Sequence, residues 1–263
     1  MNVNQSKPAI VFPYHDPAGT MFRHLEAITP VLKQTFSQAY LSITPQTRAV
    51  SQENVQQLEK DRFFRLIFLP DDTPVGKHFL SLYKYAAASC RPETLLHLCF
   101  IDRLAFALQT GHRDQFIQDV SSVNPAGAPL IFQRSATAWN THPYNYFTTE
   151  RIATLVGELL LRRSLDFAWC HLAIQAEHLI RILPAVQSHD MSMMAELVLL
   201  CQDQINTLQV DWLAWEDPFI LACDPAALKL EREGSAQETR KRLSYILPMV
   251  ERIVEYSSKQ SEN

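Results

Sequence analysis

The residue best placed for chemistry in this chain is Asp102, which follows the apolar run from Leu95 to Ile101. The run is long enough for one buried strand, and we predict a strand over Leu95 to Asp102. In an open α/β sheet, ligands bind just beyond the carboxyl ends of the strands. A carboxylate at that point can hold a metal ion or a hydroxyl group, but aspartate is also a common helix cap. The sequence leaves both interpretations of Asp102 open.

A second carboxylate, Asp16, follows the first apolar run of the chain, as Asp102 follows the run from Leu95 to Ile101. Pro13, Tyr14 and His15 separate it from the predicted strand over Ala9 to Phe12. At such a position, Asp16 can accept a hydrogen bond from a nucleotide base or ribose. It can equally serve as a turn or cap residue before the next helix.

Two later acidic sites are also candidates for function. Glu196 lies within a very apolar predicted helix, where a charged residue needs a partner or a purpose. It can also lie on a solvated face of that helix. Glu216 and Asp217 follow a predicted strand, and they either form a turn or face the same cleft as Asp102.

A glycine and a lysine, Gly76 and Lys77, follow the predicted strand over Phe63 to Leu69 and open a helix. Backbone amides and an ammonium group at that place can together bind a diphosphate. A Gly-Lys pair is a weak signal, and an ordinary surface lysine is the simpler interpretation.

Composition excludes several classes of protein. A chain of 263 residues makes one large domain or two small ones, and its net charge of -4 gives no reason to expect nucleic-acid binding. Neither a GxGxxG fingerprint nor a Walker A loop is present, and no GxSxG elbow supports Ser-His-Asp catalysis. The histidines lack HxH and HxxxH spacing, so we expect most of them at the surface or behind other site residues.

The five cysteines are scattered and form no CxxC pair, which argues against zinc and against a disulfide framework. We expect buried reduced thiols and a cytoplasmic protein. The stretch from Met1 to Phe12 has no features of a signal peptide. The chain has no apolar run long enough to cross a membrane.

The elements that position these residues alternate between strand and helix in the first half of the chain. Such alternation predicts a mostly parallel sheet covered by helices on both faces. In the second half we expect two more strands, a loop over 135–146, and helices from residue 149 onward that continue through 165–183. The predicted strands are 9–12, 39–43, 63–69, 95–102, 130–133 and 207–213, and the predicted helices of the first half include 20–36, 51–60 and 74–88.

Taken in order, these features resemble the GT-A glycosyltransferases. The segments that carry the resemblance are Ala9–Asp16 with its proline and acid, Gly76–Lys77, Leu96–Asp102 at the place of the Asp-x-Asp metal motif, and Glu196 through Asp217. The last of these resembles a late segment of dolichol-phosphate-mannose-type enzymes. Residues 157–163, Gly-Glu-Leu-Leu-Leu-Arg-Arg, also resemble the GELLMRR segment of mannosylglycerate synthases.

The resemblance implies a GT-A-like α/β fold with a mostly parallel central sheet flanked by helices and with additional C-terminal helices. It implies a nucleotide-sugar-binding and acceptor domain over 1–235, and we expect a C-terminal helix with a frayed tail over 236–263. The implied activity is sugar transfer from a UDP- or GDP-linked donor to a small-molecule or glycan acceptor, with Mg²⁺ or Mn²⁺. A homo-oligomer is compatible with the sequence.

The resemblance also assigns roles to residues. Asp102 and Asp217 would hold the metal, and Glu196 would act as a base or orient the acceptor hydroxyl. Charge alone suggests Arg134 and Arg162 as partners of an anionic acceptor. The implied nucleotide-sugar ligands are Pro13, Tyr14, His15, Asp16, Gly76 and Lys77.

One departure from the family pattern leaves other functions open. Phe100 occupies the place of the first acid of Asp-x-Asp, so only the last acid remains at Asp102. A degenerate GT-A-like domain that binds a ligand or partner without catalysis is therefore the main alternative. A third hypothesis is an interaction protein built on the helices after Thr149, with an exposed apolar face over 149–204 and a filled cleft at the strand ends.

Overall fold

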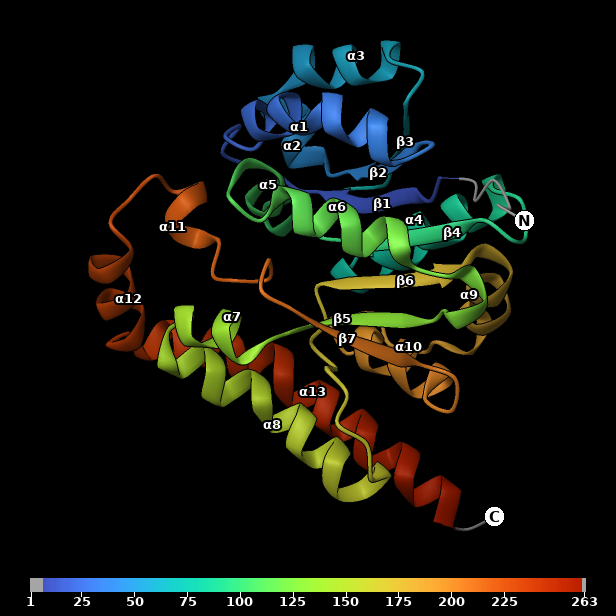
Figure 1. Ribbon diagram of the computed structural model, residues 1–263, viewed down its shortest axis with the longest axis vertical. Helices are drawn as coiled ribbons and strands as arrows, with labels where there is room; N and C mark the ends of the chain where they lie inside the picture. Colours follow the sequence, from blue (N-terminus) through green and yellow to red (C-terminus); the bar gives the residue numbers. More distant parts are fainter. Residues whose placement is uncertain (1–6, 262–263) are drawn as a thin grey trace.

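A computed structural model describes residues 7–261, and its centre is a sheet of seven strands within that range (Figure 1). The strands lie in the order β3-β2-β1-β4-β6-β5-β7. Their bounds are β1 (Ala9–Tyr14), β2 (Ala39–Ile43), β3 (Phe64–Phe68), β4 (Leu95–Cys99), β5 (Leu130–Arg134), β6 (His171–Gln175) and β7 (Asn206–Val210).

The sheet is mostly parallel, as the alternation of elements predicts. β1 pairs in parallel with β2 and β4, β2 with β3, and β5 with β7. β6 runs antiparallel to both of its neighbours, β4 and β5. The predicted class, an α/β fold with a mostly parallel sheet flanked by helices, is confirmed.

Helices connect the strands and cover both faces of the sheet. Those of the first half are α1 (Phe22–Thr35), α2 (Pro45–Val50), α3 (Gln52–Lys60), α4 (Val75–Ser89), α5 (Ile101–Gln109) and α6 (Arg113–Ser122). Those of the second half are α7 (Ala136–Thr141), α8 (Tyr144–Leu161), α9 (Ala176–Ile182), α10 (Met193–Cys201), α11 (Asp217–Ile220), α12 (Pro225–Glu233) and α13 (Ala236–Ser261), with short 3-10 turns η1 (Pro125–Gly127) and η2 (Leu183–Ala185).

Side chains of β1 alternate between two apolar layers, because successive residues of a strand point to opposite faces. Phe12 and Tyr14 contribute to the layer that contains α1, α5 and α6. Ala9 and Val11 contribute to the layer that contains α4, α9 and α10. The strand is buried on both faces, which places its carboxyl end between helices.

Two long helices, α8 and α13, lie side by side beyond the β7 edge of the sheet (Figure 1). α13 packs into the core through Ile246, Met249 and Ile253. The predicted C-terminal helix is confirmed, and it runs to Ser261 rather than fraying near Tyr256. Residues 1–6 and 262–263 lie outside the described residues.

Three predictions of local structure were wrong. β4 ends at Cys99, and Asp102 lies in the first turn of α5 rather than on the strand. The expected loop over 135–146 is largely helical, because Ser135 caps α7 and α8 begins at Tyr144. The expected helix over 165–183 contains strand β6. A fully buried strand is apolar on both faces, so its pattern does not differ from that of a buried helix.

None of the helices described for residues 7–261 is long and apolar enough to cross a membrane.

Candidate functional site

The larger of two cavities at the candidate site, here called cavity A, lies at the carboxyl ends of β1, β2, β3 and β4. Its volume is about 800 Å³, which is ample for a nucleotide-sized ligand. Residues after each of these strands line it, among them Pro13, Asp16, Thr44, Asp71 and Asp102. This is where ligands bind in open α/β sheets.

A second cavity, here called cavity B, adjoins cavity A and has a volume of about 370 Å³. Asp102, Phe100 and Tyr245 are among the residues that line both. Cavity B also includes Asp217, so the two carboxylates predicted as metal ligands face one space. They come from helices α5 and α11, which contact each other.

Asp102 reaches the junction of the cavities because α5 begins directly after β4. Phe100, the N-cap of α5, makes no side-chain cap hydrogen bond. The backbone N–H of Arg103 donates to Oδ1 of Asp102 at 2.8 Å. The side chain of Asp102 is half-buried and faces both cavities, and its negative charge in the first turn of α5 is favourable.

A buried ion pair between Arg103 and Glu216 lies beside these carboxylates. Burial raises the pKa of Glu216 to about 8. Arg103 opposes the shift, and Asp102 and Asp217 add to it. The Arg103 guanidinium also donates to the carbonyl of Ala214 at 3.4 Å. Glu216 is thus a third carboxylate of the site, which sequence analysis noted beside Asp217 without giving it a role.

The predicted metal ligands do not form a preassembled three-ligand cluster. Within residues 7–261, one group of three His, Cys, Asp or Glu side chains has its ligand atoms within 4.8 Å of one another. It consists of His97, Cys99 and His171. Mg²⁺ is commonly held by one or two carboxylates together with substrate phosphates. Asp102 and Asp217 fit that donor set, because both offer hard oxygens to one cavity.

Asp16 lines cavity A, but its carboxylate is already bonded within the protein. Oδ1 accepts from the backbone N–H of Thr20 and Oδ2 from that of Met21, each at 2.8 Å. The Tyr14 hydroxyl donates to Oδ2 at 3.3 Å, and burial raises the pKa of Tyr14. Asp16 therefore shapes the loop before α1, and binding of a nucleotide by its side chain stays a prediction.

His15 and His78 provide the imidazoles of cavity A. His15 is exposed, and its Nδ1 lies 3.0 Å from the Thr44 hydroxyl. His78 is 8% exposed, and its Nδ1 has no hydrogen-bond partner among the described residues. Burial, together with the charge of His15, lowers the pKa of His78. His78 is a lining residue that sequence analysis missed, although it directly follows Lys77.

Gly76 and Lys77 lie in the first turn of α4 but do not line either cavity. The N–H of Gly76 donates to the carbonyl of His189 at 2.9 Å. A Cβ atom on Gly76 would lie 2.5 Å from the carbonyl oxygen of Asp190, so the glycine permits close packing of backbones. Lys77 is exposed, and binding of a diphosphate by this pair stays a prediction.

Glu196 lies in α10, outside both cavities, and binds a loop and a helix. Its carboxylate accepts from the backbone N–H groups of Gln187 and Ser188 at 2.7 and 3.0 Å. The Ser188 hydroxyl donates to it at 2.7 Å, and Arg252 of α13 pairs with it at 3.3 Å. These bonds satisfy the charge in an otherwise apolar helix, and a catalytic role of Glu196 stays a prediction.

Arg134 lines cavity B at the end of β5 and is buried in a network of charges. It pairs with Glu150 at 3.1 Å and with Asp166 at 3.5 Å, and its guanidinium lies 4.4 Å from the centre of the Trp139 ring. Glu150 pairs in turn with Arg242 at 3.1 Å. Burial lowers the pKa of Arg134, but Cys170, Glu150 and Asp166 together raise it by more. The net pKa lies above its usual value, so the guanidinium stays charged.

The other arginine predicted to hold an acceptor lies elsewhere. Arg162 ends α8 in the left-handed conformation, with φ of 58°, and its side chain is exposed. It does not line cavity A or cavity B. Lys241 of α13 does line cavity B, and among the described residues of that cavity it is the cation without an ion pair.

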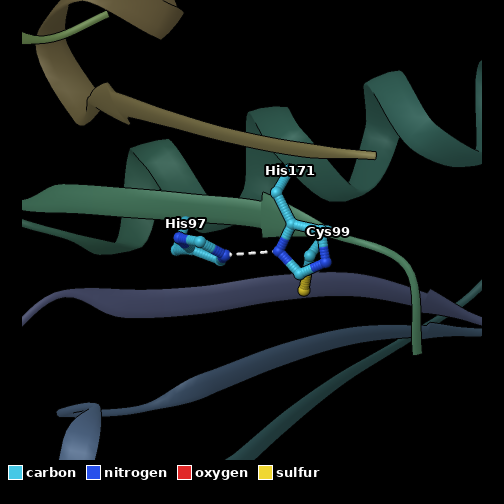
Figure 2. Close-up of side chains that lie close together, drawn as sticks. All are labelled: His97, Cys99 and His171. Atoms are coloured by element: carbon cyan, nitrogen blue, oxygen red, sulfur yellow. Dashed lines mark hydrogen bonds between the residues drawn. The ribbon is translucent and has the colours of Figure 1, made fainter. Parts of the chain in front are cut away.

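Six of the nine histidines are buried rather than at the surface, and two of them form a pair in the core. His97 and His171 are 1% and 0% exposed, and Nε2 of His97 lies 2.7 Å from Nδ1 of His171 (Figure 2). With Cys99 they form the one group of three ligand atoms named above. The spacing His-x-Cys on β4 places two of them on one face, which was a usable signal. His171 lies on the strand that sequence analysis missed.

No protein-family model matches this chain, and a search of curated proteins finds no significant match.

Proposed function

We propose that this protein is a GT-A-type glycosyltransferase that moves a sugar from a UDP- or GDP-linked donor to an acceptor in cavity B. The observation that carries the proposal is the position of Asp102, which faces both cavities where they adjoin. The nucleotide would occupy cavity A, at the ends of the parallel strands. The ordered resemblance of the segments from Ala9 to Asp217 adds the chemical class of the donor.

Mg²⁺ or Mn²⁺ would be held by Asp102 and Asp217, and it would stabilise the negative charge of the leaving diphosphate. The chain itself then orients the acceptor. Lys241 lines cavity B and forms no ion pair with any of residues 7–261, which favours a small acceptor that carries a carboxylate or phosphate. We place the protein in the cytoplasm, in keeping with its five free thiols.

A second candidate function is a GT-A-like domain that binds a ligand without catalysis. The specific observation in its favour is Phe100, which lines both cavities where the family has an acid and packs on Phe79 at 5.5 Å between ring centres. The hypothesis of an interaction protein fits less well. α8 does expose Leu155, Leu159 and Leu160, but the strand-end cleft is not filled, since cavity A measures about 800 Å³.

Titration calorimetry with UDP and with GDP, in the presence and absence of Mn²⁺, tests the proposal. We expect metal-dependent binding of one nucleotide by the wild type and its loss in Asp102→Asn. Asp114→Asn is the matched control, because Asp114 also lies in the first turn of a helix but is exposed on α6. No binding of either nucleotide with Mn²⁺ would refute the proposal.

A second assay, on the same wild type and variant, distinguishes catalysis from binding alone. Incubation with UDP-glucose or GDP-mannose and Mn²⁺, followed by measurement of released nucleoside diphosphate, detects transfer to water when no acceptor is present. We expect slow release by the wild type and none by Asp102→Asn. Binding of nucleotide without release or transfer would select the non-catalytic alternative.

A further inference from the structure

The strand pairing brings three potential metal ligands together inside the sheet, and they are not among the residues that line cavity A or cavity B. His97 and Cys99 are two residues apart on β4, so their side chains leave the same face. His171 on β6 is the direct cross-strand partner of Cys99 in the antiparallel ladder. Figure 2 shows the two imidazoles pointing toward one another, with the sulfur of Cys99 beside the His171 ring.

The surroundings of this group, here called the His₂Cys cluster, are aromatic. The His97 ring centre lies 5.4 Å from that of Phe132 and 5.9 Å from that of Phe116, and the His171 centre lies 4.9 Å from that of Trp212. All three members of the cluster are buried. Such a setting disfavours polar atoms that lack partners.

Two ring nitrogens of the cluster are in that position. Nδ1 of His97 and Nε2 of His171 have no hydrogen-bond partner in the described part of the chain, because the two rings use their other nitrogens on each other. One hydrogen bond between the imidazoles therefore satisfies only one nitrogen of each buried ring within the described residues. An ion between the rings would bind the two facing nitrogens, Nε2 of His97 and Nδ1 of His171, in place of the hydrogen bond that they share.

We propose that the His₂Cys cluster binds one monovalent soft metal ion, Cu(I), in a three-coordinate site. The Cys99 thiol would lose its proton to solvent as the Cu–S bond forms, with no change of oxidation state. Thiolate and imidazole ligands suit Cu(I). One thiolate, two neutral imidazoles and a monovalent ion make an uncharged centre, which an apolar core accommodates best.

Zn²⁺ fits the same residues less well. Structural zinc sites have four ligands, and no fourth His, Cys, Asp or Glu joins the cluster among residues 7–261. Zn²⁺ with one thiolate would also leave a net positive charge in the core. For the three-coordinate site, an ion about 2.0 Å from each nitrogen at a trigonal angle separates the nitrogens by roughly 3.5 Å, so the 2.7 Å pair must open by roughly 0.8 Å.

Anaerobic titration of the reduced, full-length protein with Cu(I), in competition with bicinchoninate, tests this site. We expect one tightly bound ion per chain and a loss of affinity of at least about 100-fold in Cys99→Ala, since losing even an outer-shell partner costs 10–100-fold. Cys201→Ala is the matched control. Cys201 is also buried, and its sulfur lies 3.7 Å from His178 Nε2, but within residues 7–261 it belongs to no group of three ligand residues.

X-ray absorption of the loaded wild type provides a second measurement, which does not depend on the folding of a variant. We expect three-coordinate copper with two nitrogen ligands and one sulfur ligand. Equal retention of copper by wild type and Cys99→Ala, or a spectrum dominated by several sulfurs, would overturn the proposal and leave His97 and His171 as a hydrogen-bonded core pair. Preferential retention of Zn²⁺ in a parallel titration would overturn the assignment to a monovalent ion.

Discussion

Replacement of Glu196 by alanine should destabilise the protein by about 3 kcal/mol. The substitution removes two backbone hydrogen bonds, one hydroxyl hydrogen bond and one ion pair, all made by a single carboxylate. Hydrogen bonds to charged groups contribute roughly 1.5–3 kcal/mol each. The sum is reduced because Gln187 is exposed, so water can satisfy its amide after the change. Ser188, by contrast, is 5% exposed, and its backbone amide and hydroxyl would lose their partner inside the protein.

Urea denaturation followed by circular dichroism measures this free energy directly. For a chain of 263 residues, about 3 kcal/mol corresponds to a fall in Tm of roughly 6–12 °C. Glu255→Ala is the control, because Glu255 pairs with the same Arg252 at 2.8 Å but its side chain is 54% exposed. We expect the control to lose less than about 1 kcal/mol. Equal losses in the two variants would refute the assignment of a structural role to Glu196.

Two further predictions concern α4 and the carboxylates of cavity B. Gly76→Ala should cost about 1–3 kcal/mol, because the new Cβ meets backbone atoms of residues 189–190 that cannot move cheaply. Gly111→Ala, with nothing within 4 Å of its Cβ, should leave the urea midpoint nearly unchanged. Mn²⁺ affinity should rise by up to roughly tenfold per pH unit between pH 6 and 8, because Glu216, whose pKa burial raises to about 8, adds a negative charge beside Asp102 and Asp217 when it loses its proton. Calorimetry at three pH values should show a flat profile in Glu216→Gln; a wild-type profile as flat as that of the variant would contradict the coupling.

The sequence predicted the first half of the fold well, because its strands and helices differ in pattern. β2 matches its prediction at both ends, and β1, β3 and α4 differ from theirs by one or two residues. Each strand there is a short apolar run followed by a polar turn, and each helix is amphipathic. The strand-end rule then places Asp16 and Asp102 at cavity A without any knowledge of the tertiary structure.

β6 could not be predicted in the same way. Its residues, His171 to Gln175, are buried between β4 and β5, so no polar alternation identifies them as a strand. The two histidines of the His₂Cys cluster lie 74 positions apart, and only the antiparallel pairing of β4 with β6 brings them together. Missing one strand therefore hid a whole cluster of side chains.

Some predicted site residues line a cavity, and others are bound within the protein by hydrogen bonds and ion pairs. The sequence does not reveal these bonds. Glu196 is an apparent functional residue because it is charged in an apolar helix, yet Ser188 and Arg252 account for its charge. Asp217 lines cavity B, and its carboxylate has no such set of bonds to the described part of the chain. The difference between them lies in loop and helix packing, which follows from tertiary structure rather than from residue type.

Phe100 has a consequence for how the proposed enzyme would bind its ligands. Its ring lines both cavities and packs on Phe79. Among the described residues, the proposed ligands of a divalent cation there are therefore Asp102 and Asp217, because the third carboxylate of the site, Glu216, pairs with Arg103. Hard cations require several oxygen ligands, and the remaining oxygens would come from the diphosphate and from water. Metal and nucleotide would then each bind weakly alone and much more tightly together. Strong mutual dependence in calorimetry is therefore the behaviour that a site with two available carboxylates predicts, whereas an independent metal site would require a third carboxylate that is not already paired, as Glu216 is with Arg103.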